Sequence, residues 1–187
     1  AKEIEGELKY AVRRQEETIY HRQLKMTSPA LNRFRDLVLY NLEAGQAVLT
    51  DNNDIRIYTD GKEKFHALIE EMKRAKKYIH VQYYIIRNDE VWQDIEKVLI
   101  EKAHEGVEVR VLFDSMGCRT MHKRDWDRLK CEGIRVAEFF PAILGQLQMR
   151  VNYRNHRKIV VIDGKVGFVG GFNVGREYIG KDEKFGY

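Results

Sequence analysis

Strand-like and helix-like patterns alternate along the chain between residues 55 and 139. Runs of β-branched and aromatic residues, typical of strands, are separated by segments whose apolar residues recur every three or four positions, as on one face of a helix. The expected strands are residues 55–59, 78–86, 107–113 and 134–139, and the expected helices centre on Leu68, Val98 and Trp126. This alternation favours an α/β domain in which neighbouring strands run parallel and helices flank the sheet.

A β-hairpin is predicted to close this sheet. Residues 159–162 form a β-branched run, Asp163 and Gly164 make a dipeptide typical of a tight turn, and an apolar run at residues 166–169 follows the turn. Strands joined by such a turn pair in antiparallel fashion, so the sheet as a whole is expected to be mixed.

Side chains at both ends of the hairpin suit chemistry on a phosphate. Because strand side chains alternate, His156 and Lys158 are expected on one face. The lysine would offset charge on the non-bridging oxygens, and the histidine would be nucleophile or general acid. Gly170 and Gly171 would allow close backbone approach, and Asn173 would donate a further hydrogen bond. An exposed basic hairpin with a solvated histidine is the alternative.

The residues around this histidine resemble a known motif. A pattern His-x-Lys-x4-Asp begins at His156 and ends at Asp163. Six intervening residues then lead to Gly-Gly-x-Asn, and the whole resembles the signature of the phospholipase D superfamily. The longer string at residues 155–173, NHRKIVVIDGKVGFVGGFN, resembles that of bacterial cardiolipin synthases. The resemblance covers residues 50–187 and implies a phospholipase D-like α/β fold, a mixed sheet flanked by helices.

This resemblance implies a two-step phosphodiester exchange that needs no metal and no cofactor. One histidine attacks phosphorus to give a phosphohistidine, while a second histidine, from a second copy of the motif, protonates the leaving group. His156 would be one of this pair, Lys158 would hold the phosphate, and Asp163 completes the catalytic motif but is expected to serve the turn. The implied reaction of the complete enzyme converts two phosphatidylglycerol molecules into cardiolipin and glycerol.

Two residues outside the hairpin are candidates for substrate contact. Gln82 lies on the polar face of the expected strand 78–86, where the family places an acid or amide that faces the active cleft. Asp114 follows the expected strand 107–113 at the edge where open α/β sheets bind ligands, and it matches an aspartate in the family's first half. An internal hydrogen-bond network for Gln82 and a helix cap or turn for Asp114 are the alternatives.

The sequence holds one copy of the motif, because His21 and His122 lack its lysine and aspartate at the required spacing. The other half of the site would come from a missing C-terminal region or from a second chain. The carboxylate that orients the histidine is expected at Asp182 or Glu183, or beyond residue 187.

Three functions are compatible with half an active site. The favoured one is the first catalytic half of a cardiolipin synthase, with phosphatidylglycerol and the membrane surface as partners and no nucleic acid. The second is a phosphodiesterase or nuclease of the same superfamily that pairs two chains. The third is a non-catalytic module that binds phosphate or anionic lipid.

The first 47 residues are charged and are predicted to form a helical appendage before a phospholipase D-like domain at residues 48–187. The appendage is expected to lie on a membrane surface or to pack on the domain. The net charge of +4 suits an anionic substrate, and no apolar run approaches the roughly 20 residues that span a bilayer.

Cardiolipin synthases carry membrane-spanning segments before their catalytic part. The resemblance therefore implies that this chain is an excised piece of a protein in the cell membrane, with its active part in the cytoplasm. The irregular stretch at residues 140–149 is expected to fill the core or, alternatively, to contact acyl chains.

Overall fold

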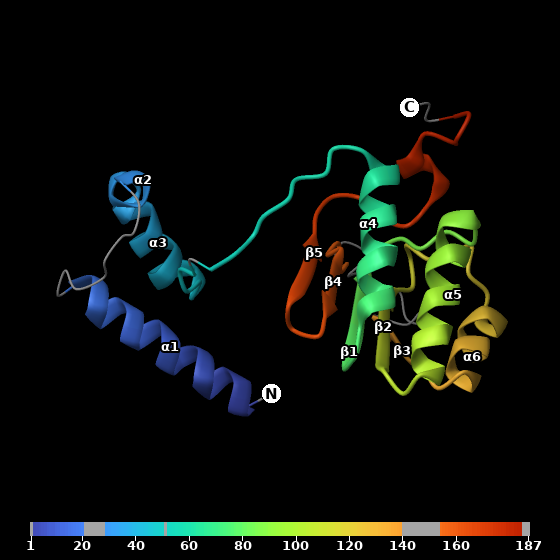
Figure 1. Ribbon diagram of the computed structural model, residues 1–187, viewed down its shortest axis with the longest axis horizontal. Coiled ribbons are helices and arrows are strands. Elements are labelled where there is room, and N and C mark those ends of the chain that lie inside the picture. Colours follow the sequence, from blue (N-terminus) through green and yellow to red (C-terminus); the bar gives the residue numbers. More distant parts are fainter. Residues whose placement is uncertain (1, 21–28, 51, 140–153, 185–187) are drawn as a thin grey trace, which may run out of the picture. The chain divides into compact units, whose positions relative to one another are not determined.

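The computed structural model describes residues 2–20, 29–50, 52–139 and 154–184 (Figure 1). The chain divides into two compact units, residues 1–56 and 57–187. The stretch at residues 140–149 lies outside the described residues, so its role in the core or at acyl chains stays a prediction. The domain boundary expected after residue 47 also stays a prediction.

The first unit contains the helices α1 (Lys2–Tyr20), α2 (Pro29–Arg33) and α3 (Arg35–Gly45). A small apolar cluster joins α1 to α3, and its buried members are Val12, Ile19 and Leu42. The Gln15 side chain donates a hydrogen bond to the Leu49 carbonyl oxygen at 2.9 Å and accepts one from the Leu49 amide at 2.6 Å. These two bonds tie the segment after α3 back to α1, and the helical appendage is confirmed.

The second unit alternates helices and strands before it ends in a hairpin. Its elements are α4 (Gly61–Arg74), β1 (Tyr78–Tyr83), α5 (Glu90–His104), β2 (Glu108–Asp114), α6 (Lys123–Cys131), β3 (Arg135–Phe139), β4 (Ile159–Ile162), β5 (Val166–Val169) and the 3-10 helix η1 (Arg176–Ile179). The strands form one sheet in the order β3-β2-β1-β4-β5. The β1–β2 and β2–β3 pairs are parallel, whereas β1–β4 and β4–β5 are antiparallel. The predicted mixed α/β sheet is therefore confirmed.

The strand expected at residues 55–59 does not form. These residues have no regular secondary structure, and Ile55 and Ile57 are 79% and 86% exposed. A β-branched run stabilises a strand only when a neighbouring strand pairs with it and its apolar face is covered. Both isoleucine side chains here stay in solvent, so the prediction from propensity alone was wrong.

One face of the sheet carries the main core. Alternate residues of β1 are buried at Ile79, Val81 and Tyr83, and the helices contribute buried side chains such as Leu68 of α4 and Trp92 of α5. Figure 1 shows α4 and α5 side by side along the sheet. The intervening residues of β1 are partly exposed.

The antiparallel position of β4 brings the motif to a defined edge of the sheet. Ile159, the first residue of β4, pairs with Gln82 near the carboxyl end of β1. The residues just before β4 therefore reach the same edge as the loops that follow β1 and β2. Open α/β sheets bind ligands at this edge.

Candidate active site

His156 and Lys158 meet at one aromatic ring, that of Tyr84. The imidazole of His156 stacks on the Tyr84 ring with centroids 3.8 Å apart and planes inclined by 23°. The Lys158 Nζ lies 5.5 Å from the centroid of the same ring and donates a hydrogen bond to the His156 carbonyl oxygen at 2.6 Å. Partial burial lowers the pKa of Lys158, because desolvation disfavours its charged form. The arrangement places a cation beside an exposed imidazole.

Asp114 anchors the segment that leads to His156. Its side chain is fully buried, and its Oδ1 accepts hydrogen bonds from the amides of Met116 and Gly117 at 2.9 and 3.4 Å. The Oδ2 accepts from the Asn155 amide at 3.3 Å, and Arg154 Nη1 lies 3.8 Å from Oδ1. The carboxylate thus bonds to amides of both the turn after β2 and the segment before β4. These bonds fit the expectation that Asp114 forms a turn, and its substrate contact stays a prediction.

Asn173 joins the segment after β5 to the segment after β1. Its Oδ1 accepts a hydrogen bond from the Ile85 amide at 3.2 Å, and its Nδ2 donates to the Tyr178 hydroxyl at 2.8 Å. The main chain continues this link, since the Val174 amide donates to the Ile85 carbonyl oxygen at 3.1 Å. Asn173 thus stabilises the carboxyl edge of the sheet, and both the oxygen and the nitrogen of its side-chain amide already make hydrogen bonds within the chain.

The glycine pair before Asn173 stays in open space. A Cβ atom built on Gly170 or Gly171 would meet nothing within 4 Å, and both residues are exposed. Apart from their neighbours in the chain, none of the described residues comes within 4 Å of these two Cβ positions, and the close backbone approach expected there stays a prediction. Space beside these two residues is available to a substrate.

Asp163 lies at the far end of β4 from His156. Its carboxylate accepts hydrogen bonds from three successive amides, those of Lys76, Lys77 and Tyr78, at 2.8, 2.8 and 2.9 Å. These bonds lower the pKa of Asp163, with the Tyr78 amide contributing most. The residue also adopts a left-handed backbone with φ of 54°, which aspartate tolerates better than most residues. This geometry suits a structural role in the turn and at the start of β1.

Gln82 is partly exposed and lies in β1 opposite Ile159. Within the described part of the chain, its side chain makes no hydrogen bond. Its expected substrate contact stays a prediction. The neighbouring polar residue His80 is tied up instead, because its Nε2 lies 3.0 Å from Glu108 Oε1.

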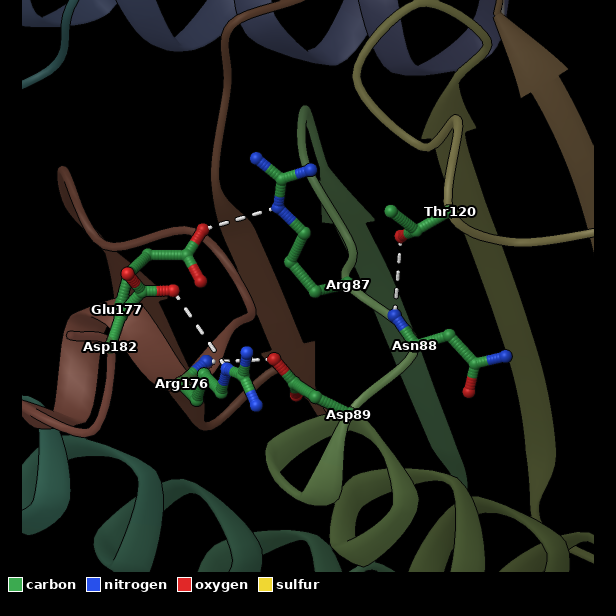
Figure 2. Close-up of a pocket in the computed structure, with 7 residues that line it drawn as sticks. All are labelled: Arg87, Asn88, Asp89, Thr120, Arg176, Glu177 and Asp182. Atoms are coloured by element: carbon green, nitrogen blue, oxygen red, sulfur yellow. Dashed lines mark hydrogen bonds and ion pairs between the residues drawn. The ribbon is translucent and has the colours of Figure 1, made fainter. Parts of the chain in front are cut away.

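A polar pocket of about 320 Å³ adjoins this edge of the sheet (Figure 2). Its lining residues are Arg87, Asn88, Asp89, Thr120, Arg176, Glu177 and Asp182. Arg87 Nε lies 3.2 Å from Glu177 Oε1, and the Arg176 amide donates to Asp89 Oδ2 at 2.8 Å. Asp182, one of the two candidates to orient the histidine, lies with its Oδ2 3.8 Å from Arg176 Nε.

The charges of this pocket argue against an anion site. Three carboxylates outnumber two guanidinium groups, and each guanidinium has a carboxylate close by. Burial raises the pKa of Asp89, although hydrogen bonds from the Arg176 and Trp92 amides oppose this effect. The hydrogen bonds and ion pairs of its lining residues link the loop after β1 to the segment around η1.

A family model described as "Cardiolipin synthase, PLD-like domain" matches residues 68–183. The matched range contains β1, β2, the hairpin and every residue of the edge described above. The chain is a member of this cardiolipin synthase family. The resemblance carried by the string at residues 155–173 is therefore confirmed.

Curated relatives bear the same family name. The chain is 45% identical over 180 residues to a cardiolipin synthase of Oceanobacillus iheyensis, which covers 96% of this chain and 37% of that protein. It is 44% identical over 187 residues to cardiolipin synthase 2 of Staphylococcus epidermidis, covering 100% and 38%. A Staphylococcus aureus cardiolipin synthase is 50% identical over 155 residues, covering 83% and 31%. The chain spans less than two fifths of the length of each of these relatives.

Two solved structures match part of this chain. NucT from Helicobacter pylori matches with a TM-score of 0.49 at 17% identity, covering 65% of this chain and 74% of that one. The phospholipase D family member Nuc from Salmonella typhimurium matches with a TM-score of 0.46 at 20% identity, covering 63% and 68%.

The described part of the chain shows neither a metal-binding cluster nor a membrane-spanning helix. There, no group of three or more His, Cys, Asp or Glu side chains is placed to hold a metal ion. No helix among the same residues is long and apolar enough to cross a membrane.

Tyr84 is the residue of this edge that the sequence did not single out. It belongs to a Tyr-Tyr-Ile run at the end of an expected strand, where an aromatic residue is ordinary. The only available signal was its position at the carboxyl end of β1, because its contact with His156 joins residues that are 72 positions apart.

Proposed function

We propose that this chain supplies one half of the active site of a cardiolipin synthase. The complete enzyme transfers a phosphatidyl group between two phosphatidylglycerol molecules and gives cardiolipin and glycerol. The observation that carries the proposal is the convergence of His156 and Lys158 on Tyr84, at the carboxyl edge of a sheet within the family's matched range. An imidazole and an ammonium group at one point suit attack on a phosphodiester.

The reaction runs in two steps. In the first, one histidine attacks the phosphorus of a phosphatidylglycerol, and the bond to the glycerol oxygen breaks while the other histidine gives that oxygen a proton. In the second, the now neutral partner histidine takes the proton of a hydroxyl on the second phosphatidylglycerol, whose oxygen attacks the phosphohistidine. The phosphorus–nitrogen bond breaks, and both histidines return to their starting states.

His156 is one member of that pair, and the other comes from a second motif copy, in a further segment or a second chain. Lys158 turns from the His156 carbonyl oxygen to a non-bridging phosphate oxygen and stabilises the charge that builds there. No cofactor takes part. The substrates lie in a bilayer, so the complete enzyme works at the cell membrane, with anionic phospholipid rather than nucleic acid as its partner.

The test uses full-length protein in membranes and labelled phosphatidylglycerol. His156→Ala should lower cardiolipin formation by at least about 10²–10⁴-fold, because both nucleophile and acid–base roles require the imidazole. The matched control is His66→Ala, which changes an exposed histidine of α4. Equal rates for wild-type and His156→Ala protein would end the proposal.

Two further readouts assign the details. Acid-quench trapping of a labelled phosphohistidine at residue 156 identifies His156 as the nucleophile, whereas a label only on the partner histidine makes His156 the acid. Cleavage of DNA or a simple phosphodiester by the chain, with second-order dependence on its concentration, would instead support a paired-chain phosphodiesterase.

A further inference from the structure

The His156 imidazole is held by an aromatic ring stacked on its face. The residue is exposed and lies in a segment without regular secondary structure, before β4 begins. The Tyr84 ring stacks on the face of the imidazole. The direction of a catalytic side chain matters, because a misplacement of about 1 Å can cost about 10²-fold in rate.

Tyr84 itself is fixed by other parts of the domain. A Cβ atom on Gly117 would lie 1.9 Å from the Tyr84 carbonyl oxygen, so the turn after β2 passes directly against this peptide. The Cys118 Sγ lies 3.6 Å from the same oxygen as a donor, and the next amide, that of Ile85, is held by Asn173. The backbone at Tyr84, from which the ring projects, is therefore held by the turn after β2 and the segment after β5, independently of His156.

A second histidine of the same sheet shows a different arrangement. His80 stacks on Tyr78 with ring centroids 4.5 Å apart and planes inclined by 27°, and its Nε2 is also engaged by Glu108. His156 has a closer stack, at 3.8 Å, but no hydrogen bond from either ring nitrogen to another described residue. Stacking uses the face of the imidazole and leaves the nitrogens at its edge open to a substrate.

We propose that Tyr84 is a positioning residue that fixes the plane of the His156 imidazole through its ring and not through its hydroxyl. The inference rests on the proposed function, since it concerns the histidine that attacks or protonates the phosphodiester. The Lys158 ammonium lies 5.5 Å from the same ring centroid, within reach of a cation–π attraction to the aromatic face. One ring thus aligns both side chains before a substrate arrives.

The test compares three variants in full-length protein. Tyr84→Phe keeps the ring and should keep turnover close to wild type. Tyr84→Leu removes the ring and should lower kcat by about 10–100-fold with little change in KM, because orientation is lost while binding contacts remain. Tyr78→Leu breaks the other histidine–tyrosine stack and is the matched control, with kcat expected to stay near the wild-type value.

A readout on the imidazole itself separates alignment from loss of folding. In protein carrying isotope-labelled histidine, the ring protons of His156 should show the shift caused by a stacked aromatic ring in wild type and Tyr84→Phe. That shift should vanish in Tyr84→Leu. If Tyr84→Leu does not fold, Tyr84→His offers a smaller planar ring. The inference then requires turnover between those of wild type and His156→Ala, and a His156 ring-proton shift smaller than in wild type.

Each failure has a distinct signature. If His156→Ala is inactive but Tyr84→Leu turns over like wild type, the positioning role is wrong and the proposed function stands. If Tyr84→Phe loses as much rate as Tyr84→Leu, the hydroxyl acts and the stacking role is wrong. If His156→Ala is fully active, the proposed function itself fails.

Discussion

The two ends of β4 carry parts of one sequence motif, but they are held in opposite ways. At the turn end, the Asp163 carboxylate faces inward to the backbone and accepts three amide hydrogen bonds at the start of β1. At the other end, the Tyr84 ring is stacked on the face of the exposed His156 imidazole. Six residues, which include all four of β4, separate the two positions.

This contrast separates two kinds of requirement within the motif. A group whose polar atoms are all bonded within the chain stabilises the fold but has nothing left to offer a substrate. An imidazole that is oriented by stacking on its face keeps its ring nitrogens open to a substrate, but stacking restrains the ring only weakly. On this contrast we propose that Asp163 serves the folding of the hairpin and that His156 serves the chemistry.

The strongest way to break this comparison is to truncate each end separately. His156→Ala should abolish most turnover, by about 10²–10⁴-fold or more, and leave the unfolding midpoint unchanged. Asp163→Ala should lower the midpoint by several degrees, because three amides lose their acceptor and alanine disfavours the left-handed backbone, while turnover per folded molecule stays the same. Thermal unfolding and labelled-lipid turnover on the same samples would check both. An Asp163→Ala protein with normal stability and no turnover would place Asp163 in the chemistry.

The covered face beneath the His156 end contains a buried lysine that should make stability depend on pH. Lys64 is 8% exposed, and its Nζ donates to the Tyr83 hydroxyl at 2.7 Å. Burial lowers the pKa of Lys64 from 10.5 to about 7. Between these values the unfolded chain binds more protons than the folded one, so stability rises with pH by up to about 1.4 kcal/mol per unit.

Denaturant unfolding at pH 7 and pH 9 would measure this effect. Wild-type protein should gain about 2–3 kcal/mol over that interval, whereas Lys64→Met should show a much smaller gain. The matched control is Lys62→Met, at an exposed position of the same helix, and it should keep the wild-type slope. A Lys64→Met slope equal to that of wild type would mean that the lysine is solvated in the folded protein.

A smaller perturbation would sharpen the comparison from within the His156 end. Gly117→Ala forces a Cβ atom to within 1.9 Å of the Tyr84 carbonyl oxygen unless one backbone segment shifts. The expected result is a loss of about 1–3 kcal/mol of stability together with reduced turnover, since Tyr84 would move away from His156. Gly167→Ala is the control, because a Cβ there meets nothing within 4 Å. Stability lost with turnover intact would show that the alignment tolerates movement of Tyr84.

Much of the fold was accessible from local pattern. The alternation between residues 60 and 139 predicted the order of helices and strands, because burial of one helix or strand face imposes a repeat of about 3.6 or of 2. The dipeptide Asp163-Gly164 predicted the hairpin, since both residues tolerate a positive φ, and they have values of 54° and 68°. The β-branched residues at 55–59 show the limit of such signals, because a strand also needs a partner.

The sequence by itself determined the motif and the hairpin that carries it. Only the tertiary structure decided how each polar group is used: Asp114 on the Asn155 amide, Asn173 on the Ile85 amide and Tyr84 on the imidazole of His156. These contacts join residues 41, 88 and 72 positions apart. Spacing along a chain encodes which face of an element is buried. It does not encode which distant donor a carboxylate, an amide or an aromatic ring will meet, because pairing between elements is set by how their faces pack.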